Sequence, residues 1–258
     1  MKKLAIASAL LSAIAVTGTA HAYQAEVGAS AGLIDPDNGS SSGSFGVDGI
    51  YYFNPVQTRN APMAEAAFLD RASNVNAHIN YNEVGDDEVT KYGVGAEYYV
   101  PNSDFYLSGN VGRQDVDYAG GGDSDTTLYG AEVGYLPAPG LLIAAGLKGY
   151  DNDNNDGVDP TIRAKYVTQL SNGNDINLEA GAAFGDLDEY NLAADYFIDK
   201  SFSVGADYYN NDLSDNSEFG VNARKFFTQQ VSLEGRIGFG EVGNNDYNKF
   251  GVAAKYRF

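Results

Sequence analysis

Apolar and polar residues alternate along most of the chain, and its last ten residues, KFGVAAKYRF, show the pattern clearly. The apolar members of this stretch are Phe250, Val252, Ala254, Tyr256 and Phe258, and the residues between them are small or basic. A repeat of two places the apolar set on one face of a β-strand and the other set on the opposite face. The apolar face could line the core of a soluble protein or face a lipid bilayer, and alternation alone leaves both interpretations open.

Runs of about ten residues with this alternation recur after Ala22, separated by residues that favour turns. They predict strands at Tyr23–Leu33, Ser44–Phe53, Ala67–Tyr81, Glu88–Val100, Asp104–Gln114, Asp125–Leu136, Gly140–Tyr150, Thr161–Leu170, Asp175–Phe184, Glu189–Ile198, Ser201–Asn210, Ser217–Phe226, Val231–Glu241 and Asp246–Phe258. Several hairpins repeat one plan, which is typical of an up-and-down meander. The chain is therefore expected to be all-β, a closed antiparallel transmembrane barrel of about 14 strands in which the last strand pairs with Tyr23–Leu33.

The connections between these strands alternate in length. Pro101–Ser103 and Asp199–Lys200 are tight, whereas Asp35–Gly43, Ala119–Asp125 and Asp151–Asp159 are longer and rich in Asp, Asn and Gly. Short turns at one end and longer loops at the other are typical of barrels in bacterial outer membranes.

One connection on the short-turn side, Asn54–Ala66, is long. It fits a turn with a helical twist that Pro62 opens, because proline is favoured at the first position of a helix. It also fits a plug or a docking element for a partner. The sequence leaves both interpretations open.

The first 22 residues have the features of a cleaved signal peptide. Lys2 and Lys3 precede the apolar run LAIASALLSAIAV, and Ala20-His21-Ala22 is a small-x-small cleavage site. The expected organisation is a signal peptide at 1–22 and one barrel at 23–258. No later stretch reaches the roughly 20 apolar residues that a spanning helix needs.

Composition excludes several classes of function. The chain of 258 residues has 16 Lys and Arg against 35 Asp and Glu, a formal charge of −19 and no Cys. Nucleic acid is not an expected partner, because its phosphates are bound by basic residues. Without cysteine the chain has no thiolate nucleophile and no thiolate-ligated metal. No cofactor or resident metal is expected.

The loop Asn152–Gly157 resembles half of a calcium-binding loop, but Arg163 stands where the bidentate Glu belongs. The loop is therefore interpreted as solvated. The alternative is that the acidic loops bind divalent cations weakly.

Three features favour lipid outside and water inside. The apolar faces have Ala, Val and Leu at mid-height and Tyr or Phe at the ends, as aromatic girdles require. A barrel of about 14 strands is too wide to fill with side chains alone. The signal peptide directs the chain out of the cytoplasm.

The opposite faces then line a lumen. The predicted lining residues are Glu26, Asp48, His78, Glu97, Glu132, Lys148, Arg163, Lys165, Glu179, Asp195, Asp207, Arg224, Glu234, Arg236, Lys255 and Arg257. Acidic and basic patches on opposed walls would create a transverse field that orients dipolar solutes, whereas ion pairs would make the wall rigid. His78 is expected to line the lumen, because no nucleophile or carboxylate pair is placed beside it. The chain is not expected to be an enzyme.

The stretch YYFNPVQTRNAPMAEAAFLDRASNV, Tyr51 to Val75, resembles the "putative porin" family of Gram-negative outer-membrane channel proteins. Ala22-Tyr23-Gln24 and the Arg257-Phe258 end extend the resemblance. It implies a pore in the cell outer membrane, among lipid and lipopolysaccharide. Tyr256 and the terminal Phe258 also resemble the signal that such barrels present to the barrel-assembly machinery.

The expected function is passive diffusion of water and small polar or charged solutes through a narrow lumen of mixed charge. The alternative is a non-conducting barrel that acts as an adhesin or as a structural protein of the envelope.

Overall fold

The computed structural model describes residues 22–84, 86–185, 188–212 and 215–258. The predicted signal peptide, apart from Ala22, lies outside these residues. Within them the chain forms fourteen strands and two short helical elements. These are β1 (Ala22–Pro36), β2 (Ser42–Gln57), η1 (Met63–Glu65), α2 (Ala66–Leu69), β3 (Asn74–Val84), β4 (Asp87–Tyr99), β5 (Phe105–Asp117), β6 (Asp123–Ala138), β7 (Leu141–Asn152), β8 (Asp156–Gln169), β9 (Asp175–Ala183), β10 (Glu189–Asp199), β11 (Phe202–Asn211), β12 (Asn216–Phe226), β13 (Val231–Val242) and β14 (Asn245–Arg257).

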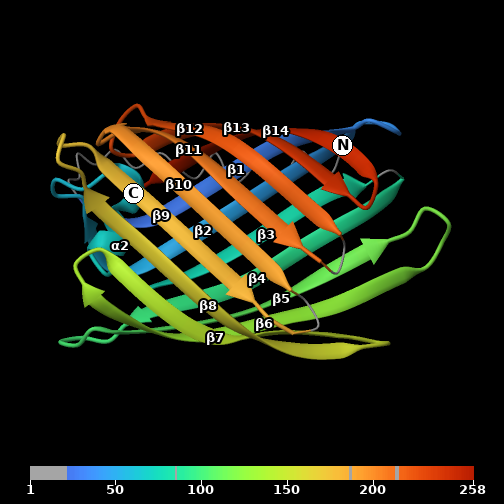
Figure 1. Cartoon of the computed structure of the whole chain (residues 1–258), viewed down its shortest axis with the longest axis horizontal. Coiled ribbons are helices and arrows are strands. Elements are labelled where there is room, and N and C mark those ends of the chain that lie inside the picture. The colour runs from blue at the N-terminus through green and yellow to red at the C-terminus, as the bar shows by residue number, and fades with distance from the viewer. Residues whose placement is uncertain (1–21, 85, 186–187, 213–214) are drawn as a thin grey trace.

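The strands form a closed antiparallel barrel in which each strand pairs with its neighbours in sequence (Figure 1). The last strand closes the barrel against the first, in a register that runs from Glu26 opposite Arg257 to Pro36 opposite Tyr247. Backbone hydrogen bonds from Gln24 and Ala25 to the Phe258 carbonyl extend this seam to the end of the chain. The predicted class, strand number and closing pair are confirmed.

The prediction for the third strand was wrong at its start. Residues 67–69 belong to α2 rather than to a strand, and β3 begins only at Asn74. The run AEAAFL carries no β-branched residue and is rich in Ala, which is a strong helix former. Both helical elements are short, and within the described part of the chain no helix is long and apolar enough to cross a membrane.

The strands extend further than predicted at the end opposite α2. The eighth strand begins at Asp156 rather than Thr161, because Asp156 pairs with Asp151 and Gly157 with Tyr150. Much of the expected loop Asp151–Asp159 is therefore strand. Cross-strand pairs at 148–151 continue the hairpin although the segment is rich in Asp and Asn.

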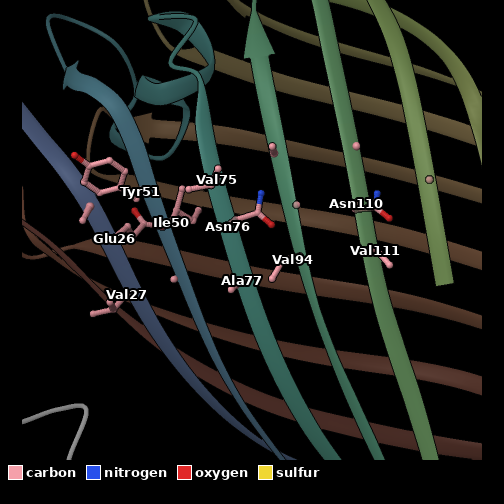
Figure 2. Close-up of a pocket in the computed structure, with 16 residues that line it drawn as sticks. Glu26, Val27, Ile50, Tyr51, Val75, Asn76, Ala77, Val94, Asn110 and Val111 are labelled. Carbon is pink, nitrogen blue, oxygen red and sulfur yellow. The ribbon is translucent and has the colours of Figure 1, made fainter. Parts of the chain in front are cut away.

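The outer surface is apolar on every strand. All fourteen strands carry large apolar side chains that are exposed, among them Leu33, Val94, Ile143, Leu192 and Val252. A soluble monomer rarely exposes apolar patches larger than a few hundred Å². A surface that is apolar all round the barrel fits a lipid bilayer. The face of β1 to β6 includes a shallow apolar hollow lined by Val27, Tyr51, Val75, Val94 and Val111 (Figure 2).

Candidate functional site

The inward faces of β6 to β10 carry several ion pairs. Arg163 on β8 binds Glu132 on β6, with an Nη2–Oε2 distance of 2.8 Å. Lys165, two residues further along β8, binds Glu179 on β9 at 2.8 Å and Glu65 at 2.7 Å. Lys148 on β7 reaches Glu189 on β10 at 2.9 Å. Two of these pairs cross intervening strands: Arg163–Glu132 crosses β7, and Lys148–Glu189 crosses β8 and β9.

The strands from β11 to β14 continue the pattern. Arg224 binds Glu234 at 2.5 Å. Arg236 donates to Asp207, through Nε at 3.0 Å, and also binds Glu218 at 2.5 Å. The bases that the sequence places in the lumen on β12 and β13 therefore both lie beside an acid.

The barrel seam carries the most deeply buried pair. Arg257 binds Glu26 at 2.5 Å, and the two side chains are only 5% and 4% exposed. The guanidinium also lies 4.4 Å from the ring centre of Tyr23 and 4.5 Å from that of Phe226. Lys255 adds a second contact to Glu26 at 3.2 Å. The last strand is therefore held to the first by charge as well as by backbone hydrogen bonds.

These pairs decide between the two interpretations of the wall charges. All seven bases that the sequence assigns to the lumen have a carboxylate within 4 Å. The structure therefore shows paired wall charges, as the second interpretation expects.

Two of the predicted acids differ from the rest. Glu97 accepts hydrogen bonds from the Tyr106 hydroxyl and from Asn74 Nδ2, both at 3.0 Å. Asp195 accepts one from Asn177 Nδ2 at 3.3 Å. Within the described residues neither carboxylate forms an ion pair, and the side chains that donate hydrogen bonds to them are neutral. His78 lies on β3, opposite Asp48 on β2 and Gly93 on β4.

The long connection from β2 to β3, residues 58–73, lies across the lumen at the end that holds the C-terminus (Figure 1), and we call it the plug segment. The Met63 amide donates to the Lys200 carbonyl at 2.7 Å, in the turn between β10 and β11. The Met63 carbonyl accepts from Arg257 on β14 at 2.8 Å. Arg71 binds Asp104, between β4 and β5, at 2.9 Å. A segment that leaves β2 thus contacts several well-separated parts of the barrel wall.

Apolar packing fixes the plug segment. Ala66 is fully buried in a cluster with Tyr23, Tyr52 and Val56 from β1 and β2. Phe68 packs against a second cluster, formed by Tyr99, Tyr106, Leu136 and Leu142 from β4 to β7. The expected turn with a helical twist is confirmed, since Pro62 directly precedes η1, which continues into α2. The same segment also extends inside the barrel, where it contacts Lys165 and Arg257.

Polar cavities remain inside the barrel above and beside the plug segment. One, of about 430 Å³, lies between the plug segment and the wall and is lined by Glu97, Arg163, Lys165, Asn177 and Asp195, among others. A second, of about 350 Å³, is lined by Asn110, Glu132, Lys148 and Glu189. The two share Glu97, Tyr106 and Arg163, so they are contiguous along the wall.

The sequence missed three acids that complete the ion pairs. Glu189 and Glu218 have the same inward parity as Asp195 and Arg224 on their own strands, so extending the alternation would have identified them. Glu65 lies in the plug segment, and nothing in its sequence indicates that it contacts Lys165. In the described part of the chain, no group of three Asp, Glu or His side chains is arranged to hold a metal ion.

Comparison with known structures places this barrel among outer-membrane proteins. The outer membrane protein Omp33 of Acinetobacter baumannii is 28% identical, with a TM-score of 0.70, and the match covers 92% of this chain and 99% of that one. The monoaromatic hydrocarbon channel CymD, at 9% identity and a TM-score of 0.58, covers 92% and 89% and shares the fold. Comparison with curated proteins gave no match.

The resemblance seen in the sequence is confirmed by a family model. The model described as "putative general bacterial porin" matches residues 1–159, more than half of the chain, and the protein therefore belongs to that porin family.

Proposed function

We propose that this porin passes water and small polar or charged solutes by diffusion through a narrow lumen of mixed charge. The observation that carries the proposal is the pair of contiguous polar cavities inside a barrel whose outer surface is apolar. Charged side chains on a narrow wall select solutes by sign and by hydrogen bonding. The plug segment narrows this path at the end where the C-terminus lies.

We place the protein in the outer membrane, surrounded by lipid and lipopolysaccharide. Membership of the porin family and the 28% sequence identity to the outer membrane protein Omp33 support this location. Weakly held divalent cations on the acidic loops and delivery by the barrel-assembly machinery are further parts of the proposal.

A non-conducting barrel is the second candidate, and the plug segment favours it. Contacts to β8, to β14 and to the turn between β10 and β11 hold this segment across the lumen.

Recording from purified protein in planar bilayers separates the two functions. Small current steps in KCl, together with swelling of proteoliposomes in small sugars, support the channel. Adhesion or envelope defects without any current support the alternative.

Reversing the charge of Arg236 is expected to shift ion selectivity toward cations. Arg236 neutralises both Asp207 and Glu218, so Arg236→Glu leaves three carboxylates together on the wall. A local excess of negative charge raises the concentration of cations in the pore. The reversal potential in a KCl gradient measures the shift.

Arg113→Glu is the matched control for this experiment. Arg113 follows the outward parity of Val111 on β5 and pairs with Asp115 and Asp125. Changing the sign of the charge at Arg113 should leave the reversal potential equal to that of the unaltered protein. Equal shifts in both variants would contradict selection by the lumen wall.

We also propose that Tyr256 and Phe258 form the assembly signal. Phe258 is 46% exposed on the outer surface, and its ring centre lies 6.1 Å from that of Tyr256. Phe258→Ser should reduce the fraction of barrel inserted in the outer membrane, measured by the heat-dependent shift of folded barrels on gels. The conductance of those barrels that do insert should be unchanged. Normal insertion of this variant would disprove the assembly role.

A further inference from the structure

Lys91 is the one base in the described part of the chain that has no acidic partner. It lies on β4 six residues before Glu97, so the two side chains share the inward face, and Lys91 is exposed there. Every other Lys and Arg that the structure describes has a carboxylate within 4 Å. The chain has 35 acidic and only 16 basic residues. An ammonium group without an acid in so acidic a chain remains available to a solute.

The acids on the same face of β4 are too far along the strand to neutralise Lys91. Asp87 is four residues away and Glu97 is six, which correspond to about 13 and 20 Å along a strand. Asp87 accepts a hydrogen bond from the Ala119 amide at 2.9 Å, and Glu97 accepts one from the Tyr106 hydroxyl at 3.0 Å. Both acids are therefore engaged elsewhere.

The charge of Lys249 on β14 reinforces that of Lys91. The two ammonium groups lie near enough for Lys249 to act electrostatically on Lys91. The acid beside Lys249 is Glu218, at 3.6 Å, and Glu218 is shared with Arg236 at 2.5 Å. Like charges at this level of the lumen favour an anion between them.

Lys91 also lies in a row of neutral residues that runs across six neighbouring strands. Cross-strand pairing gives the row, from β1 to β6, as Ser30, Gly46, Asn80, Lys91, Gln114 and Thr126. No member of the row is acidic. The side chains of Asn80 and Gln114, on either side of Lys91, form no hydrogen bond with the residues that the structure describes, and the same holds for Ser30 and Thr126. Water or a solute is left to bind them.

Gly46 lets two of these side chains lie close together. A Cβ atom at position 46 would lie 2.5 Å from Asn80 Oδ1 and 2.6 Å from Ser30 Oγ. Both oxygens therefore lie over the glycine, where a larger residue would displace them. The row offers one ammonium group beside neutral hydrogen-bonding groups from several strands.

We infer that this row binds small carboxylates that also carry hydroxyl groups, in the half of the lumen away from the plug segment. A carboxylate accepts hydrogen bonds from an ammonium group, and the bond is strong because both groups are charged. Hydroxyl groups donate to and accept from amide side chains. Chloride would use only the charge of Lys91, and an uncharged polyol only the amides, so a hydroxy acid is the solute that uses both. As a statement about transported solutes, the inference rests on the proposed channel function.

The test uses gluconate as a probe of the reconstituted channel in KCl, with sorbitol as its uncharged counterpart of similar size. Millimolar gluconate should interrupt the current in a concentration-dependent way, and sorbitol should do so only at much higher concentration. Lys91→Gln keeps a hydrogen-bonding side chain but removes the charge, and should weaken the apparent affinity for gluconate about tenfold, as expected for the loss of a hydrogen bond between charged groups. Lys91→Arg should retain most of it.

Lys225→Gln is the matched control. Lys225 follows Arg224 on β12 and so points to the outer face, where it pairs with Asp199 at 3.3 Å. This variant should bind gluconate like the unaltered protein. Asn80→Leu tests the neutral part of the row and should weaken the affinity for gluconate severalfold, while the effect of acetate stays unchanged.

The outcomes separate this inference from the channel function. Channels that conduct KCl but respond equally to gluconate and sorbitol, or whose response to gluconate is the same in Lys91→Gln and Lys225→Gln, would overturn the inference and leave the channel in place. If no preparation conducts, the channel proposal fails, and titration calorimetry on the folded barrel in detergent decides the site. Heat of gluconate binding that disappears in Lys91→Gln supports the site, and no heat with the unaltered barrel refutes it.

Discussion

Replacing residues 58–73 with a short Gly-Ser turn is expected to raise the single-channel conductance severalfold. The plug segment places Glu65, Ala66 and Phe68 inside the barrel, where Glu65 binds Lys165 on the opposite wall. Removing it widens the narrowest part of the path, and conductance rises with the open cross-section of a water-filled pore. Planar-bilayer recording at fixed voltage measures the change.

Two point variants sharpen this experiment. Glu65→Gln removes the charge from the buried contact to Lys165 and should increase the frequency of open events without changing the barrel. Arg59→Ala is the control within the same segment, because Arg59 is 74% exposed and pairs with Asp70 of that segment. If the variant with the short turn folds and its current equals that of the unaltered protein, the segment does not restrict the lumen.

Arg257→Ala is expected to cause the largest loss of stability among single substitutions in the barrel wall. It leaves Glu26 buried without its closest base and removes contacts to Tyr23, Phe226 and the Met63 carbonyl. Removing one partner of a buried ion pair costs about 3–5 kcal/mol. The urea concentration at the unfolding midpoint in detergent or lipid measures the effect.

The control for this substitution is Arg113→Ala. Arg113 is 44% exposed and its acidic partners are also exposed, so its loss should leave the unfolding midpoint almost unchanged. A double variant, Glu26→Gln with Arg257→Met, should recover part of the stability because no charge is left buried. Equal midpoints for Arg257→Ala and Arg113→Ala would show that the seam pair does not stabilise closure.

The strands and their faces could be predicted because a strand's alternation is a local property. Val94 and Glu97 lie three positions apart on one strand, and this spacing alone puts them on opposite faces. By the same rule Phe250 and Lys255, which are five positions apart on the last strand, lie on opposite faces. The barrel, its closing seam and its inward-facing charges follow from such local patterns and from the number of strands.

The plug segment could not be predicted with the same rules. A short apolar run such as AEAAFL fits a helix or a strand, and periodicity does not separate the two. Its contacts, such as Glu65 to Lys165, join residues that are distant in sequence and meet only once the barrel has closed. The ion pair between Lys148 and Glu189 could not be predicted for the same reason. It crosses β8 and β9 and depends on the curvature of the wall.

The central claim is that ions pass through the water-filled interior, and the absence of cysteine allows a direct test. Asn110 lines an interior cavity, whereas the next residue, Val111, is 50% exposed on the outer face (Figure 2). Single channels of Asn110→Cys and Val111→Cys are recorded before and after a charged, water-soluble thiol reagent is added. The current through Asn110→Cys should fall in a step, and the current through Val111→Cys should not change. No current in either variant, or an equal response in both, would contradict conduction through the lumen.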